Sequence, residues 1–161
     1  MAEPTSDQLR VRLVTPERTL FEAAATAVEL PSKSGYMEVL YGHAPLMAEL
    51  GAGDVTIHGI SAQGPASAGA GGADRSAGGE LLRYNVSWGF VEVLPDRVTI
   101  LASDALKPEE IDVPRAEQQR ERGEKMWKEA GESEAAYDEA LRVISEADAK
   151  IASADATSKT H

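Results

Sequence analysis

FVEVLPDRVTIL, residues Phe90–Leu101, is the stretch that decides the fold class of this chain. Apolar and polar residues alternate before the pair Pro95-Asp96, and the run after it is rich in β-branched residues. Alternation with a period of two is typical of a strand that buries one face, and β-branched residues favour strands. Two such runs around a two-residue break predict a β-hairpin.

Shorter runs of the same kind precede this hairpin and are separated by turn-forming residues. They cover Leu9–Leu13, Ala27–Leu30, Tyr36–Leu40, Leu46–Leu50, Val55–Ile57 and Leu81–Val86. We expect the second run to stop at Pro31, and the last to be a strand separate from the one that follows Gly89. Many short strands at a spacing of roughly 8–12 residues predict a sandwich or barrel.

After Asp104 the spacing of apolar residues changes from the period of a strand to that of a helix. Pro108–Pro114 is read as a helix start, in which Asp112 caps the first turn and the helix runs to about Ala130, ending at Gly131. Ser133 can cap a second helix, 134–154. The two helices predict an antiparallel hairpin.

The apolar stripe of the second helix is thin. Tyr137, Leu141, Ile144 and Ile151 fall near one face, and Asp148 interrupts it. A hairpin with so little to bury is marginal alone. We therefore expect it to need the sandwich or a partner, and to dock in one state and detach in another.

The predicted fold class is α+β, with an N-terminal antiparallel β-sandwich at 1–105 and a helical hairpin at 106–161. Within the sandwich, the segment 61–79 is rich in Gly, Ala and Ser and is expected to be a flexible loop, because it has almost nothing to bury. Its glycines lack the Lys-Ser or Lys-Thr and the following helix of a phosphate-binding loop.

Composition limits the partners. The 161 residues include no cysteine and carry a formal net charge of -11. An acidic surface repels nucleic acid and anionic lipid, although solubility alone explains it as well. No apolar run approaches the roughly 20 residues of a membrane span. Met1–Thr5 lacks the basic and apolar parts of a signal peptide.

No catalytic or metal site is expected. The histidines His43, His58 and His161 lack metal-ligand spacing, and no serine lies in a nucleophile elbow. His43, in Gly42-His43-Ala44-Pro45, is interpreted first as a turn residue bonded to the backbone and second as a protein contact. Trp88 and Trp127 are interpreted as core or interface anchors.

Several stretches, in order from Leu9 to Ile151, together resemble the epsilon subunit of the rotary proton-translocating ATP synthase of bacteria. They are Leu13–Glu22, Gly42–Leu46, Gly89–Val93, Val98–Ala102, Glu110–Ala116 and Leu141–Ile144. The resemblance implies a non-catalytic subunit of the central stalk, peripheral at the cytoplasmic face of the bacterial inner membrane. It also implies binding to the gamma subunit and the c-subunit ring, coupling of ring rotation to ATP synthesis, and helices that can extend into the alpha/beta head to inhibit ATP hydrolysis.

The resemblance assigns roles to individual positions of this chain. Gly35–His43 matches the surface of the family that faces the c ring, so Tyr36, Glu38 and His43 are the candidate contacts with the c ring or gamma. The family usually has Gly, Pro and Gly at the positions held here by Glu38, Tyr41 and Trp88.

Some members of the family bind a regulatory ATP through residues that match Asp112 and Arg115. The arginines that these members use on the second helix are placed at Ala136 and Ala140 here, so no cofactor is expected.

Two other functions stay open. A stand-alone β-sandwich module that binds carbohydrate would need exposed aromatic residues, and only 5% of this chain is aromatic. A small hydrolase would have to use His43.

Overall fold

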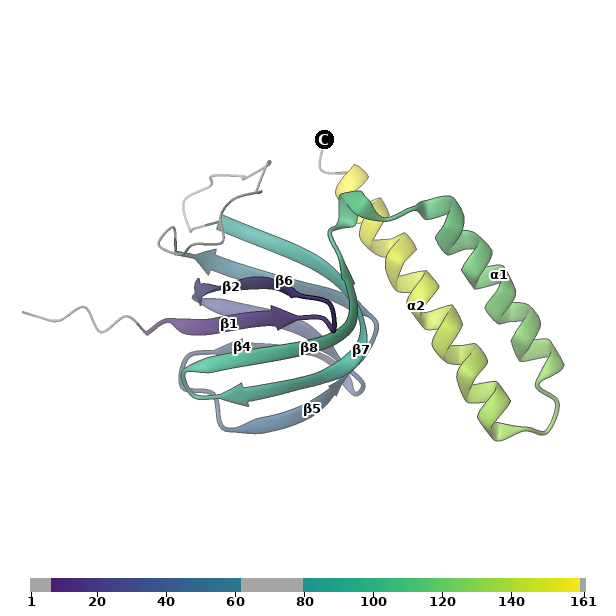
Figure 1. The fold of residues 1–161 in the computed structure, drawn as a ribbon, viewed down its shortest axis with the longest axis horizontal. Helices are drawn as coiled ribbons and strands as arrows, with labels where there is room; N and C mark the ends of the chain where they lie inside the picture. Colours follow the sequence, from purple (N-terminus) through teal and green to yellow (C-terminus); the bar gives the residue numbers. More distant parts are fainter. Residues whose placement is uncertain (1–6, 62–79, 160–161) are drawn as a thin grey trace, which may run out of the picture.

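The computed structural model describes residues 7–61 and 80–159. The predictions made for Met1–Thr5, for the loop residues 62–79 and for His161 lie outside them. A curved sheet forms the body, and two antiparallel helices lie beside one end of it (Figure 1). The α+β class, a sandwich followed by two helices, is confirmed.

Eight strands are present in the described residues. They are β1 (Leu9–Val14), β2 (Thr19–Ala25), β3 (Ala27–Ser32), β4 (Gly35–Leu40), β5 (Leu46–Leu50), β6 (Gly53–Ile60), β7 (Glu80–Leu94) and β8 (Arg97–Leu106).

Hydrogen bonds order the strands as β2-β1-β8-β7-β5-β3-β4, and β6 pairs with both β3 and β7. The hairpin predicted around Pro95-Asp96 is the β7–β8 pair, in register from Leu94 opposite Arg97. All pairs are antiparallel except β1 with β8. This parallel pair departs from the antiparallel prediction, because these strands are far apart in sequence and no tight turn fixes their direction.

One strand serves both layers. The first half of β7 pairs with β6, and its second half pairs with β5. The two separate strands predicted before and after Gly89 are therefore a single bent strand.

The bend lies at Trp88-Gly89, where both residues have positive φ, 38° and 137°. A Cβ on Gly89 would collide with the carbonyl oxygen of Leu101, so only glycine fits there. The ladder is interrupted at this point, and the Ser103 hydroxyl donates to the Ser87 carbonyl at 2.6 Å.

Pro31 does not end β3, contrary to the prediction. Proline lacks an N–H, but the ladder from β3 to β6 has already ended at Glu29. The Pro31 carbonyl still accepts a hydrogen bond from the Gly51 amide at 3.0 Å. The strand can therefore continue to Ser32.

The core lies between the layers and is almost entirely aliphatic. Fully buried side chains come from every strand, and the largest include Leu9, Leu13, Leu30, Leu50, Ile57 and Ile100. From β2, Phe21 reaches the same cluster. Close packing of this kind gives the body its rigidity.

The helices are α1 (Val113–Glu129) and α2 (Glu134–Ser158). Asp112 accepts from the Arg115 amide and Ser133 from the Ala136 amide, so both predicted caps are confirmed. Pro108–Glu110 is a separate 3-10 turn, η1, and not the start of α1. α2 extends beyond the predicted end near Ala154.

Small residues line much of the contact between the helices, together with Ile144 of the predicted stripe. Ala116, Gly123, Ala140 and Ala147 are buried. A Cβ on Gly123 would come within 2.7 Å of Ile144 Cγ1, so the glycine permits the close approach of α2. Glycine in mid-helix costs about 1 kcal/mol of propensity, and here close packing requires it.

Two other residues of the predicted stripe are only partly covered, although the Tyr137 ring lies 6.0 Å from the Trp127 ring of α1, between centroids. Tyr137 and Leu141 are each 40% exposed. Asp148, predicted to interrupt the stripe, forms an ion pair with Arg120 of α1 at 3.2 Å. The face of α2 toward α1 therefore combines buried alanines with Tyr137 and Ile144 of the predicted stripe.

Replacing Gly89 with alanine is expected to lower the free energy of unfolding by about 2–4 kcal/mol. Backbone strain and a buried collision each cost about 1–3 kcal/mol. Urea denaturation followed by circular dichroism measures the loss. Gly35→Ala is the matched control, because Gly35 also has positive φ but no described atom lies within 4 Å of an added Cβ. Equal losses in the two variants would contradict the collision with Leu101.

Candidate functional site

The most distinctive site is the seam along which α2 lies against the sandwich. We define the docking seam by Asn85 and Trp88 of β7 and Asp104 of β8 on one side, and Arg142, Ala149 and Lys150 of α2 on the other. The bend in β7 places Trp88 there, between the half of the strand that pairs with β6 and the half that pairs with β5.

Polar contacts hold the seam. Asn85 is 2% exposed, and its Nδ2 donates to the Ala149 carbonyl at 3.2 Å and to Asp54 Oδ1 at 3.0 Å. Lys150 Nζ lies 4.0 Å from Asp104 Oδ2 and 3.0 Å from Glu146 Oε1. Both amide protons of Asn85 are used, so this side chain is matched to the docked helix.

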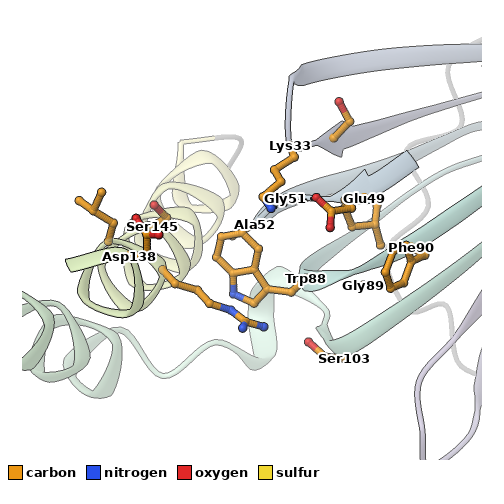
Figure 2. A pocket seen from close by; sticks show the side chains of 14 residues that line it. Lys33, Glu49, Gly51, Ala52, Trp88, Gly89, Phe90, Ser103, Asp138 and Ser145 are labelled. Atoms are coloured by element: carbon orange, nitrogen blue, oxygen red, sulfur yellow. Dashed lines mark ion pairs between the residues drawn. The ribbon is translucent and has the colours of Figure 1, made fainter. Parts of the chain in front are cut away.

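A charge–aromatic contact adds to these bonds. The Arg142 guanidinium carbon lies 5.0 Å from the centroid of the Trp88 ring, within the range of a cation–π interaction. Figure 2 shows Trp88 reaching from the sheet toward the helix that carries Asp138 and Ser145.

The seam is loosely filled. A cavity of about 780 Å³ lies between β5, β7 and α2, lined among others by Trp88, Phe90, Asp138 and Arg142. A second cavity of about 350 Å³ lies nearer the end of α2. Two buried polar atoms, Trp88 Nε1 and Ser153 Oγ, have no hydrogen-bond partner within the described residues.

Unpartnered buried polar atoms cost about 1–3 kcal/mol each, whereas a made hydrogen bond contributes only about 0.5–1.5 kcal/mol. The seam therefore relies on a few polar contacts, in contrast to the aliphatic core of the sandwich.

Tyr36, Glu38 and His43 do not form one cluster. Tyr36 begins β4 at the seam, where its hydroxyl accepts from the Asp54 amide at 3.0 Å, and it lines the smaller cavity with Ser153. Glu38 lies in mid-strand opposite Glu29. His43 follows the other end of β4.

His43 makes the backbone contact that its first interpretation predicts. Its Nδ1 lies 2.7 Å from the Ala44 carbonyl oxygen. The neighbouring Gly42 amide donates to the Pro95 carbonyl at 2.6 Å, which ties this turn to the β7–β8 hairpin. Exposed apolar side chains surround it in sequence, namely Leu40, Tyr41 and Leu46.

The structure places the residues that match the regulatory ATP motif around the start of α1 and on α2, and ATP binding there stays a prediction. Asp112 uses its carboxylate to cap α1, through the Arg115 amide at 3.1 Å. Ala140 is fully buried between the helices, so its position faces away from any ligand. Ala136, at the start of α2, supplies no charge.

Sequence reasoning missed most of the seam. Asn85 was detectable as an amide inside the apolar run Leu81–Val86, and Trp88 as a bulky residue before a glycine. Arg142 and Lys150 carry no local signal, because a charged residue on a helix is normally solvated.

One described group has a shifted pKa. Burial, and next the charge of Glu110, raise the pKa of Tyr84 above 10.0. This tyrosine lies in the core near η1 rather than at the seam.

Within residues 7–61 and 80–159, no three side chains of the His, Asp or Glu type gather as metal ligands would.

No described helix is both long enough and apolar enough to cross a membrane. The arrangement suits reversible contact between protein surfaces: a rigid sheet body and a helical hairpin joined by a few polar bonds. Fold and seam together define a protein of the α+β class in which a β-sandwich carries a helical hairpin.

Comparison with known proteins names the family. Residues 8–67 match the model of the β-sandwich domain of the ATP synthase delta/epsilon chain. The ATP synthase epsilon chain of Koribacter versatilis is 36% identical over 126 residues, 78% of this chain and 76% of the relative. That of Solibacter usitatus is 36% identical over 92% of this chain and 97% of the relative. The chain belongs to the ATP synthase epsilon chain family, a family of non-catalytic subunits.

A solved structure has the same fold. A chain in the mitochondrial ATP synthase of Euglena gracilis, in an assembly described as OSCP/F1/c-ring, superposes with a TM-score of 0.66 at 18% identity. The match covers 100% of this chain and 86% of that one. The body and the helices are therefore both part of the shared fold.

Replacing Asn85 with aspartate is expected to release α2. The change puts a carboxylate oxygen against the Ala149 carbonyl and the Asp54 carboxylate, and an unpaired buried charge costs about 3–5 kcal/mol. Hydrogen exchange should become faster along α2 and stay slow in β1 and β8. Asn85→Ala removes only the donor and should have a smaller effect. Unchanged protection of α2 in the aspartate variant would rule out this role.

Proposed function

We propose that this chain is a rotor subunit in the central stalk of the ATP synthase. The sandwich binds the gamma subunit and the c-subunit ring at the cytoplasmic face of the bacterial membrane, and so couples ring rotation to ATP synthesis in the head. The helical hairpin docks on the sandwich in one state and leaves it in another to restrain ATP hydrolysis by the alpha/beta head.

The contrast between core and seam carries this proposal. A part that transmits torque has to be rigid, and the aliphatic core supplies rigidity through fully buried side chains such as Val11, Val91 and Ile100. A part that changes state has to be held by little free energy, and the polar seam meets this condition. The relationship to epsilon chains supports both halves, because the Solibacter usitatus match spans the sandwich and the helices.

Of the three candidate contact residues, Tyr36 and Glu38 are exposed and His43 is half-buried, but only His43 lies in a turn bordered by several exposed apolar side chains. Its turn is flanked by Leu40, Tyr41 and Leu46, which are 52%, 47% and 40% exposed. Exposed apolar groups gathered around one turn are typical of a protein contact. Tyr36 lies at the seam, where α2 already covers part of its surroundings.

Deleting 107–161 tests the inhibitory half of the proposal. The deletion keeps Leu106, which pairs with Asn85 at the end of β8. In the reconstituted complex, ATP hydrolysis should rise severalfold because the restraining helices are gone, while ATP-driven proton pumping per ATP should persist. Equal hydrolysis by the full-length and truncated complexes would exclude inhibition by the hairpin. Loss of pumping would instead show that the helices are needed for coupling.

Leu46→Glu tests the partner surface. A charge in the centre of a protein contact costs roughly 1–2 kcal/mol or more, so co-purification with gamma and the c ring should weaken about fivefold to thirtyfold. Leu81→Glu is the matched control, since Leu81 is similarly exposed, at 48%, but lies at the start of β7. Equal binding by the two variants would place the contact elsewhere.

A further inference from the structure

Trp88 holds a backbone conformation that is rare for its side chain. Its φ of 38° lies in the left-handed region, and it is the one described residue other than glycine with positive φ. A bulky residue persists there only where its surroundings hold it. The body of the sandwich does not need an indole at this bend, because Gly89 provides the close approach to β8.

What Trp88 gains is the contact with Arg142. The guanidinium lies over its ring at 5.0 Å, and Arg142 has no ion pair with a described carboxylate. This arginine also lies on the α2 face that lines the larger cavity, beside Asp138, Leu141 and Ser145. The cation–π contact is thus the charge-dependent link between α2 and the bend of β7.

The same residue also carries a cost. Trp88 Nε1 is buried without a partner in the described residues, and Ser153 Oγ has the same status further along α2. When α2 leaves the sandwich, water can reach both atoms and the backbone at Trp88 is no longer held. At Trp88 the docked state therefore combines a stabilising contact with an unpartnered polar atom, and a second such atom lies further along α2.

We propose that Trp88 and Arg142 form a latch that holds the hairpin on the sandwich, and that the strain and the unpartnered indole N–H of Trp88 keep the latch easy to open. This inference deepens the proposed function and rests on it for its biological meaning, since the moving part is the same hairpin. The latch itself is a property of the isolated chain.

The test uses the full chain carrying Trp127→Phe, which leaves Trp88 as the one tryptophan of the two in the sequence. Arg142→Met in this background removes the cation and keeps an unbranched side chain of helix-favouring type. Loss of the cation–π contact should raise the ratio of undocked to docked hairpin about threefold to thirtyfold. The emission of Trp88 should shift to the red, and hydrogen exchange along α2 should accelerate by the same factor.

Two further variants sharpen the test. Arg122→Met makes the same chemical change on α1, where Arg122 is exposed and has no ion pair with a described residue, and it should leave both readouts unchanged. Arg142→Lys keeps the charge but stacks less well, so it should give an intermediate shift. Circular dichroism checks that the helical content of all variants is equal.

The proposal is overturned if Arg142→Met leaves emission and exchange as they are in the parent, or if Arg122→Met changes them equally. Because these measurements need no partner, they separate the latch from the inhibitory function. An open seam in Arg142→Met with unchanged hydrolysis by the assembled complex would support the latch and contradict inhibition by the hairpin. A hairpin that stays docked in Arg142→Met, together with hydrolysis that rises on truncation, would contradict the latch and support inhibition by the hairpin.

Discussion

The bend of β7 at Trp88-Gly89 is the constraint on which the rest of the structure depends. It lets a single strand pair with β6 in one layer and with β5 in the other, so the sandwich closes around one core. Gly89 is fixed by the carbonyl of Leu101, which leaves no room for a side chain. The same turn of the backbone directs Trp88 out of the core and toward α2, so the feature that closes the body also creates the docking seam.

The two parts are built on opposite principles. The sandwich buries aliphatic side chains completely, and each contributes about 1.5–3 kcal/mol when removed from water. The hairpin buries alanine, glycine and serine, which contribute little area, and relies on Asn85, Arg142 and Lys150 for its hold on the sandwich. Removing the helices should therefore leave the body folded, whereas the helices depend on the body.

Local features could be predicted from the sequence, and tertiary ones could not. The β7–β8 hairpin and the caps Asp112 and Ser133 follow from neighbouring residues alone, and the structure confirms them. The sequence predicts that Pro31 ends its strand. The strand continues because the β3–β6 ladder has already ended at Glu29, and this is known only once the sheet is assembled. The stripe predicted on α2 is part of the helix contact through Ile144, but Gly123 and the alanines show their role only when the helices meet.

The candidate contact residues illustrate the same limit and lead to a mechanical consequence. A continuous stretch, Gly35–His43, suggested one surface, but β4 is extended and carries Tyr36 and His43 to opposite ends. Tyr36 shares a cavity with α2, so a partner that contacts it lies beside the docked hairpin. His43 lies away from the seam, so a partner held there stays bound whether the hairpin is docked or not. A rotor subunit with its attachment at the His43 end could transmit torque continuously while its helices change state.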